Sequence, residues 1–188
     1  MHVLMAFAYG SLVCLLVEYL RLLFSDPSDP RLKEGSFQAP GIEEKNCEEC
    51  KVRVASTSYH CHSCNRCAEE FDHHCTFANN CVGKANYPIF IRLLISIIIH
   101  TSSNIGIGVW LALAREDAFR WVAVPFAVLS LVVFLEITVL AIFHCYISFC
   151  LHKTTLQVLR GDAGQSQESE QTNIQFAKPN RAQNGIEG

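Results

Sequence analysis

The sequence has little charge and no excess of positive charge. Only 18% of its 188 residues are charged, and the formal net charge is −3, which argues against the basic surface that nucleic-acid binding requires. Residues 45–92 hold six lysines or arginines against five acids and form no basic stripe. Half of all residues are hydrophobic and they gather in long runs, which argues against a single soluble core. We therefore expect a membrane protein that binds no nucleic acid.

Three apolar runs are long enough to cross a bilayer, which takes about 20 residues. They cover residues 3–24, 93–114 and 122–149. The first run lacks a preceding basic residue and a convincing small-residue cleavage site, so we interpret it as a spanning helix and not as a signal peptide. Residues 25–31 (SDPSDPR) end this helix, because proline removes a backbone donor. The predicted fold is an all-α polytopic membrane bundle with three spans.

The changes in composition divide the chain into segments. The expected order is a transmembrane helix (1–24), a linker with Asp-Pro turns (25–46), a cysteine-rich domain (47–90), two transmembrane helices (91–151) with a hairpin at 115–120, a polar segment (152–160) and a disordered tail (161–188). By the positive-inside rule, the cysteine-rich domain and the tail face the cytosol. Their side holds Arg21, Arg31, Lys33, Lys84, Arg92, Lys153 and Arg160, against Arg115 and Arg120 on the other.

A few reactive or acidic residues lie inside the predicted spans, where charge is costly. Glu18 is close to the cytosolic end, so we expect its carboxylate to extend toward the interface. Glu136 is nearer the centre, where it either pairs with His100 or the polar residues 102–104, or is protonated. Cys150, near the cytosolic face, is either a packing residue or itself acylated.

Metal binding is the best explanation of the cysteine cluster. Seven of the ten cysteines and four of the eight histidines lie within residues 47–81, and cytosolic thiols stay reduced. Structural zinc takes four thiolate or imidazole ligands, and Cys-x2-Cys turns present two sulfurs to one ion. Two zinc ions use eight of these residues and leave three over. A cysteine left over beside a histidine and an aspartate suits nucleophilic chemistry.

The cysteine-rich stretch resembles, position by position, that of the DHHC family of protein S-acyltransferases (palmitoyltransferases). The pattern is Cys47-x2-Cys50-x9-His60-Cys61-x2-Cys64-x2-Cys67-x4-Asp72-His73-His74-Cys75-x5-Cys81-x4-Asn86-x3-Phe90. Residues 79–83 (NNCVG), the Asp-Pro turns after the first helix, and residues 154–157 (TTLQ) are also similar to family motifs, the last to TTxE. The resemblance covers roughly residues 5–157, from the second of the family's four helices onward.

The resemblance implies a role for each residue of the cluster. One zinc takes Cys47, Cys50, His60 and Cys67, and the other takes Cys61, Cys64, His74 and Cys81. His62, His73 and Cys75 are left over. Cys75 is then the nucleophile, His73 the base that forms its thiolate, and Asp72 the residue that fixes the imidazole tautomer. The residues expected to contact the acyl donor are Phe77, Asn86, Thr154 and Thr155.

The activity implied is protein S-palmitoyltransfer with ping-pong kinetics. A palmitoyl group moves from palmitoyl-CoA, a long-chain acyl-CoA, to Cys75 and then to a cytosolic cysteine of a membrane-associated protein. Both zinc ions have full ligand sets and are structural. The expected location is an endomembrane, such as the Golgi or the endoplasmic reticulum, rather than the plasma membrane. The alternative function is a non-catalytic or truncated zinc-bearing membrane adapter of the same family.

The sequence departs from the family pattern at a few points. Thr76 and Phe77 stand where Pro-Trp usually follows the DHHC cysteine, and Gln157 replaces the glutamate of TTxE. No helix precedes residue 3, so either the N-terminus is exoplasmic or the sequence begins downstream of the true start. We favour the second interpretation. We expect the 188-residue form to be poorly active alone, or to need an accessory subunit or a partner helix.

Overall fold

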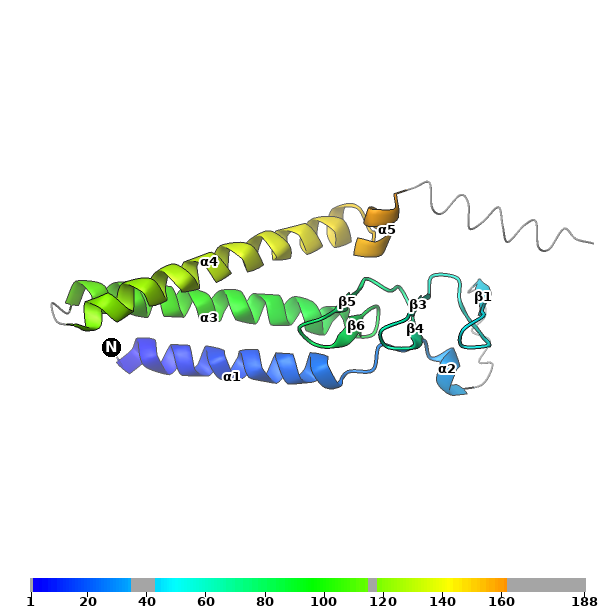
Figure 1. The fold of residues 1–188 in the computed structure, drawn as a ribbon, viewed down its shortest axis with the longest axis horizontal. Helices are drawn as coiled ribbons and strands as arrows, with labels where there is room; N and C mark the ends of the chain where they lie inside the picture. The colour runs from blue at the N-terminus through cyan, green and yellow to red at the C-terminus, as the bar shows by residue number, and fades with distance from the viewer. Residues whose placement is uncertain (1, 35–42, 115–117, 162–188) are drawn as a thin grey trace, which may run out of the picture.

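Three long helices lie side by side, with the cysteine-rich domain at one end of the bundle (Figure 1). This computed structural model describes residues 2–34, 43–114 and 118–161. The long helices are α1 (His2–Phe24), α3 (Tyr87–Ala114) and α4 (Phe119–Cys145), and α4 continues into the π-helix η1 (Tyr146–Cys150). Each is long and apolar enough to cross a membrane. The protein is therefore an integral membrane protein with three candidate spans in its described part.

The helix boundaries follow from backbone chemistry. α1 ends before the Asp-Pro turns, as predicted, but α3 begins at Tyr87 and not near residue 91. The amide of Phe90 donates to the carbonyl of Asn86 at 3.0 Å, so helical bonding is already established there. Pro88 is tolerated because amides in the first turn have no intrahelical partner. The predicted tail (162–188) and part of the predicted hairpin (115–117) lie outside the described residues.

The cysteine-rich domain consists of three antiparallel two-stranded hairpins. Their strands are β1 (Glu44–Cys47) with β2 (Val52–Ala55), β3 (Tyr59–Cys61) with β4 (Arg66–Ala68), and β5 (His73–Cys75) with β6 (Asn80–Val82). Isolated hairpins of this length are marginal in water and need other contacts to persist. Their order therefore has to come from side chains that link one hairpin to the next.

The third hairpin packs directly against the membrane helices. One buried apolar cluster joins the end of α1, this hairpin and the start of α3; its members are Leu22, Ala78, Val82, Phe90, Leu93 and Leu94. Glu18 on α1 strengthens the junction, because its carboxylate pairs with Arg21 at 3.0 Å and with Arg92 on α3 at 3.2 Å. The hairpin that carries Cys75 is thus held at the end of the spans.

The chain returns to the cysteine-rich domain after the third span. Helix α5 (Thr155–Arg160) places Leu156 against the apolar cluster around Phe71. The guanidinium of Arg160 lies over the ring of Tyr59, 4.7 Å from its centroid. A short helix α2 (Arg31–Glu34) lies on the other side, where the buried Asp29 carboxylate accepts from Ser58 Oγ at 2.6 Å. The domain is therefore fastened by both flanking segments.

Candidate active site and metal centres

The three hairpins repeat one turn at intervals of 14 residues. Each turn begins at a cysteine, and four positions later the backbone adopts a left-handed conformation. The first residues are Cys47, Cys61 and Cys75, and the left-handed residues are Lys51 (φ 55°), Asn65 (φ 49°) and Asn79 (φ 43°). Such a turn aims backbone amides back at the first sulfur. The hairpins are therefore copies of one local structure, and only their side chains distinguish them.

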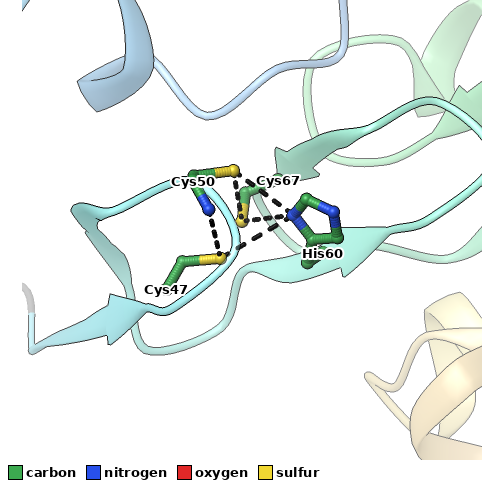
Figure 2. A group of neighbouring side chains, drawn as sticks. All are labelled: Cys47, Cys50, His60 and Cys67. Carbon is green, nitrogen blue, oxygen red and sulfur yellow. Dashed lines mark hydrogen bonds between the residues drawn. The ribbon is translucent and has the colours of Figure 1, made fainter.

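Each candidate metal centre joins two successive hairpins. In the first centre, Cys47 and Cys50 come from the β1–β2 turn, while His60 and Cys67 face each other across β3 and β4. His60 Nδ1 lies 3.3 Å from Cys50 Sγ, 3.7 Å from Cys47 Sγ and 3.8 Å from Cys67 Sγ. Figure 2 shows the four side chains converging on one point. The structure thus brings together the first predicted ligand set.

The second centre repeats this plan one hairpin later. Cys61 and Cys64 come from the β3–β4 turn, and His74 and Cys81 are cross-strand partners in β5 and β6. His74 Nδ1 lies 3.7 Å from Cys61 Sγ, 3.3 Å from Cys64 Sγ and 3.9 Å from Cys81 Sγ. The interleaving of the two sets is what ties the three hairpins into one domain.

The donor atoms of both centres fit zinc. A tetrahedral ion with Zn–S near 2.3 Å and Zn–N near 2.0 Å separates its ligand atoms by roughly 3.5–3.8 Å, and the separations here run from 3.3 to 3.9 Å. Burial, and then the nearby sulfurs of Cys47 and Cys50, raise the pKa of Cys67 above its ordinary value. Three thiols held this close can all ionise only beside a cation, so both clusters are compatible with structural zinc.

The third turn departs from the other two in its second cysteine. Ala78 occupies the position that Cys50 and Cys64 hold in the earlier turns, three residues after the first cysteine. No further hairpin follows it in the described chain to supply a histidine and a cysteine. Cys75 is a free, half-buried thiol. The structure therefore places Cys75 in a zinc-type turn that lacks the other three ligands.

His73 and His74 point to opposite sides of strand β5, because successive side chains alternate. His74 faces the second metal centre, whereas His73 Nδ1 lies 2.7 Å from Asp72 Oδ2. Asp72 is 2% exposed and accepts two further bonds, from the Thr155 amide at 2.7 Å and from Thr155 Oγ1 at 2.9 Å. The carboxylate therefore has a fixed orientation toward the imidazole.

The charges of this group support one another. Burial opposes ionisation of Asp72, but the hydrogen bonds from His73 and Thr155 hold its pKa below the usual range. Burial likewise opposes a charged His73, yet the bonds to Asp72 and Cys75 raise its pKa to about 9. His73 and the backbone amides of Ala78 and Phe77 outweigh burial and lower the pKa of Cys75. The group therefore favours a thiolate on Cys75 beside an imidazolium on His73.

Residues 154–157 form the N-terminal cap of α5, a role that was not predicted from the sequence. Thr154 caps α5 by accepting from the Gln157 amide, while Gln157 Oε1 accepts from the Thr154 amide at 2.8 Å. An amide oxygen makes this contact as well as a carboxylate, which explains why glutamine is tolerated. The cap aims Thr155 at Asp72. Both threonine hydroxyls thus make hydrogen bonds within the protein, and their contact with the acyl donor stays a prediction.

Asn86 and Phe77, which were also expected to contact the acyl donor, differ in burial. Asn86 is 1% exposed; its Nδ2 donates to Ser25 Oγ at 2.8 Å and to the Cys81 carbonyl at 2.9 Å, and its Oδ1 accepts from the Gly83 amide. It therefore joins α1 to the third hairpin. Phe77 is 90% exposed in the turn beside Cys75 and is free to contact a ligand.

Two neighbours of Asp72 were missed by the sequence analysis. His144, in the third predicted span, reaches Asp72 from α4 with 3.9 Å between Nδ1 and Oδ2, and Tyr87, which was expected in the cysteine-rich domain (47–90), contacts His144 from the start of α3. The available signal was a histidine inside an otherwise apolar run, at 144. His62, the third leftover residue, is exposed and lies beside His60, with ring centroids 5.3 Å apart.

Comparison with known proteins agrees with this geometry. No curated protein matches the chain by sequence. A family model, described as DHHC palmitoyltransferase, matches residues 41–162, which is more than half of the chain and contains both metal centres and the Asp72–Cys75 tetrad. The chain therefore belongs to the DHHC palmitoyltransferase family.

Proposed function

We propose that the protein is a protein S-acyltransferase that moves a palmitoyl group from palmitoyl-CoA, through acyl-Cys75, to cysteines of membrane-associated proteins. One observation carries this proposal: Asp72 and His73 form a buried 2.7 Å pair beside a cysteine that lacks the other ligands of a metal site. An aspartate that orients a histidine beside a nucleophile is the arrangement that recurs in acyl transfer.

The eight clustered cysteines and histidines act as zinc ligands in this proposal. Three sulfurs and one nitrogen complete each tetrahedron, so neither ion has a free position for water or substrate. Zinc supplies folding energy and no chemistry. Its effect on the reaction is to fix the third hairpin, and with it Cys75, against the membrane helices.

The first half-reaction begins with the Cys75 thiolate. Its sulfur attacks the thioester carbonyl carbon; a new carbon–sulfur bond forms as the bond to the sulfur of CoA breaks. The departing CoA thiolate takes the proton carried by the His73 imidazolium, which leaves His73 neutral. Asp72 holds the imidazole in the orientation that this transfer needs. The product is an acyl-enzyme.

The second half-reaction reverses these roles. A cysteine of the substrate protein gives its thiol proton to neutral His73, and its sulfur attacks the acyl-Cys75 carbonyl. Cys75 leaves as the thiolate that the imidazolium and the turn amides stabilise. One thioester replaces another in both steps, so the overall reaction is close to balanced. The enzyme has only to position and activate, and ping-pong kinetics follow.

The acyl chain has an apolar place beside the site. A cavity of about 450 Å³ lies between α1 and α3 and is lined by Ala6, Phe7, Gly10, Ser11, Cys14, Ser96 and Ile99. Tyr19 follows the lining residues of α1 along the helix toward the third hairpin, and its hydroxyl donates to the Phe77 carbonyl at 3.2 Å. Each buried methylene contributes about 0.8 kcal/mol. We assign Phe77, 90% exposed in the turn beside Cys75, to a contact with the acyl donor, and the two threonines to Asp72 and the α5 cap.

The orientation and location also stay proposals. The lysines and arginines near the hairpins put Cys75 on the cytosolic side, where acyl-CoA and reduced substrate cysteines are found. An endomembrane such as the Golgi or the endoplasmic reticulum is the proposed site of action. Membrane-proximal substrates follow from the position of Cys75 at the end of the bundle.

The test is to incubate the purified protein in lipid bilayers with labelled palmitoyl-CoA. We expect label to accumulate slowly as a hydroxylamine-labile acyl group at Cys75, located by mass spectrometry, because thioesters are cleaved by hydroxylamine and amides are not. A protein that binds two zinc ions but takes up no label at Cys75 would be the zinc-bearing adapter instead.

A further inference from the structure

His144 is a polar residue in a helix that is otherwise apolar around it. It lies in the last turn of α4, and its side chain is 3% exposed. A buried imidazole needs a hydrogen-bond partner, since burial without one is costly. The π-helix that follows at once, η1, widens the helix at this point, and such turns are frequent at functional sites. The partners of His144 therefore indicate what it does.

One nitrogen of His144 faces both Tyr87 and Asp72. Nδ1 lies 3.3 Å from Tyr87 Oη and 3.9 Å from Asp72 Oδ2. The Tyr87 hydroxyl also lies 3.4 Å from the His144 carbonyl oxygen, to which it donates. Because the Tyr87 hydroxyl proton is donated to this carbonyl, the Tyr87 oxygen can only accept from His144. We therefore place the imidazole hydrogen on Nδ1, where it points between the Tyr87 oxygen and the Asp72 carboxylate. This tautomer is assigned from the partners, and it places a positive bond dipole beside Asp72.

The ring of His144 also packs in the group of rings that contact His73. The ring of Phe90 makes edge contacts with both histidines, with centroids 4.9 Å from His144 and 5.2 Å from His73. The two histidine centroids are 5.9 Å apart. Donor atoms of Asp72, His73 and His144 all lie within 4.8 Å of one another. The third span thus contributes one residue to the surroundings of the Asp72–His73 pair.

We propose that His144 is a positioning residue for acyl transfer, which fixes the Asp72–His73 pair through its Nδ1 nitrogen. The inference rests on the proposed S-acyltransferase function. His144 touches neither Cys75 nor the acyl group in the proposed reaction. It acts at 3.9 Å, longer than a hydrogen bond, by directing the Nδ1–H dipole at Asp72 Oδ2 and by anchoring Tyr87, which favours the carboxylate orientation that faces His73.

Three substitutions of His144 distinguish the effect of its Nδ1 nitrogen from the effect of its ring packing. His144→Phe keeps a ring against Phe90 but removes the nitrogen. His144→Asn keeps a polar group near the place of Nδ1, and His144→Gln moves that group toward the place of Nε2. We expect His144→Phe and His144→Gln to slow acylation of Cys75 about tenfold, within the roughly 100-fold that misplacement can cost, and His144→Asn to recover most of the rate.

The measurement is rapid-quench single-turnover acylation of the full chain in lipid bilayers with labelled palmitoyl-CoA. The amplitude reports the fraction of protein that is folded and competent, and the rate constant reports the chemistry. We expect unchanged amplitude and zinc content with a lower rate. Ser130 provides the control, because it is a buried polar residue of the same helix, 14 positions before His144, whose hydroxyl donates to the Phe126 carbonyl. Ser130→Ala should keep the normal rate.

A substitution of Tyr87 tests the same nitrogen through its hydrogen-bond partner. Tyr87→Phe leaves the imidazole in place and removes the hydroxyl that orients it, so a rate loss of about threefold is expected, smaller than that of a misplaced reacting group. Equal rates in the unmodified protein and all four variants of the two residues would overturn the inference. So would a fall in amplitude and zinc content at unchanged rate, which would mean that His144 only supports the fold. Failure of the unmodified protein to label Cys75 would overturn the proposed function itself.

Discussion

Hairpins β3–β4 and β5–β6 share a backbone and differ in chemistry. Both are three-residue strand pairs with a left-handed asparagine in the turn, and both begin the turn with a cysteine, Cys61 or Cys75. In each, the backbone amides two and three residues later help to lower the pKa of that cysteine against the opposing effect of burial. The same turn therefore prepares a thiolate in both hairpins.

The neighbours of the thiolate decide its use. Cys61 meets Cys64 from its own turn and His74 and Cys81 from the next hairpin, which together make a four-donor set for a metal ion. Cys75 has Ala78 in place of the second cysteine and meets the imidazole of His73 instead. A turn that presents a zinc ligand becomes a turn that presents a nucleophile when the other ligands are absent and a histidine is supplied.

Replacing the two equivalent cysteines gives the largest expected contrast. Cys75→Ser should abolish labelling by palmitoyl-CoA and retain two zinc ions per chain, since a serine hydroxyl is far less ionised and Cys75 belongs to neither ligand set. Cys61→Ser, its counterpart 14 residues earlier, should lose zinc and unfold at lower temperature. Zinc analysis and label counting on both variants make the comparison. Zinc loss in Cys75→Ser would contradict it.

The consecutive histidines His73 and His74 extend the comparison, because one is assigned to acyl transfer and the other to a metal centre. His73→Ala should slow acylation by roughly 10² to 10⁴-fold while both zinc ions stay bound, because the loss of a general acid–base residue has that size. His74→Ala should lower the zinc content first and activity only as a consequence. Single-turnover rates and zinc stoichiometry distinguish the two. Equal zinc loss in both variants would show that β5 does not separate their faces.

The spans and the two sets of clustered cysteines and histidines were predicted from the sequence more accurately than the helix boundaries and the contacts between distant segments. Apolar runs of about 20 residues define their own helices, and a fixed spacing of cysteines and histidines limits which donors meet. Both four-residue groups assemble as the resemblance implied. Element boundaries were less accurate: the start of α3 at Tyr87 depends on the hydrogen bonds that the Asn86 carbonyl accepts from the amides of Ile89 and Phe90, which no periodicity reveals.

The contacts of Asn86 and His144 could not be predicted because they join segments far apart in the chain. Asn86 was expected to contact the acyl donor, and the structure shows it buried and bonded to Ser25, 61 residues earlier in the chain. His144 lies 72 residues from Asp72 and was hidden in an apolar run. Such tertiary pairs have no local pattern. A histidine inside an apolar run was the available signal for His144, and such a signal marks a position without identifying its partner.

Removing the Asp72 carboxylate should weaken the thiolate of Cys75 without touching the turn. In Asp72→Asn, the bond that raises the pKa of His73 to about 9 is lost, so His73 is neutral at lower pH and stabilises the thiolate less. The pKa of Cys75 then rises, and alkylation by iodoacetamide at pH 7 should fall about tenfold, equivalent to one pKa unit. The midpoint of the pH profile should move upward. Asp26→Asn, at an exposed carboxylate paired with Lys33, is the matched control and should leave the profile unchanged.

The smallest expected effect concerns Gln157, the position where this chain departs from the glutamate of its family motif. Its amide oxygen accepts from the Thr154 amide and completes the cap that aims Thr155 at Asp72. Gln157→Glu preserves an acceptor in the same place, so we expect an unchanged acylation rate. Gln157→Ala removes it; the cap weakens by roughly 0.5–2 kcal/mol, but Thr155 keeps both bonds to Asp72, and the rate should fall no more than about threefold. Single-turnover acylation compares the three proteins. A large loss in Gln157→Ala together with a large gain in Gln157→Glu would mean that charge at this position matters, and that a cap alone does not describe the segment.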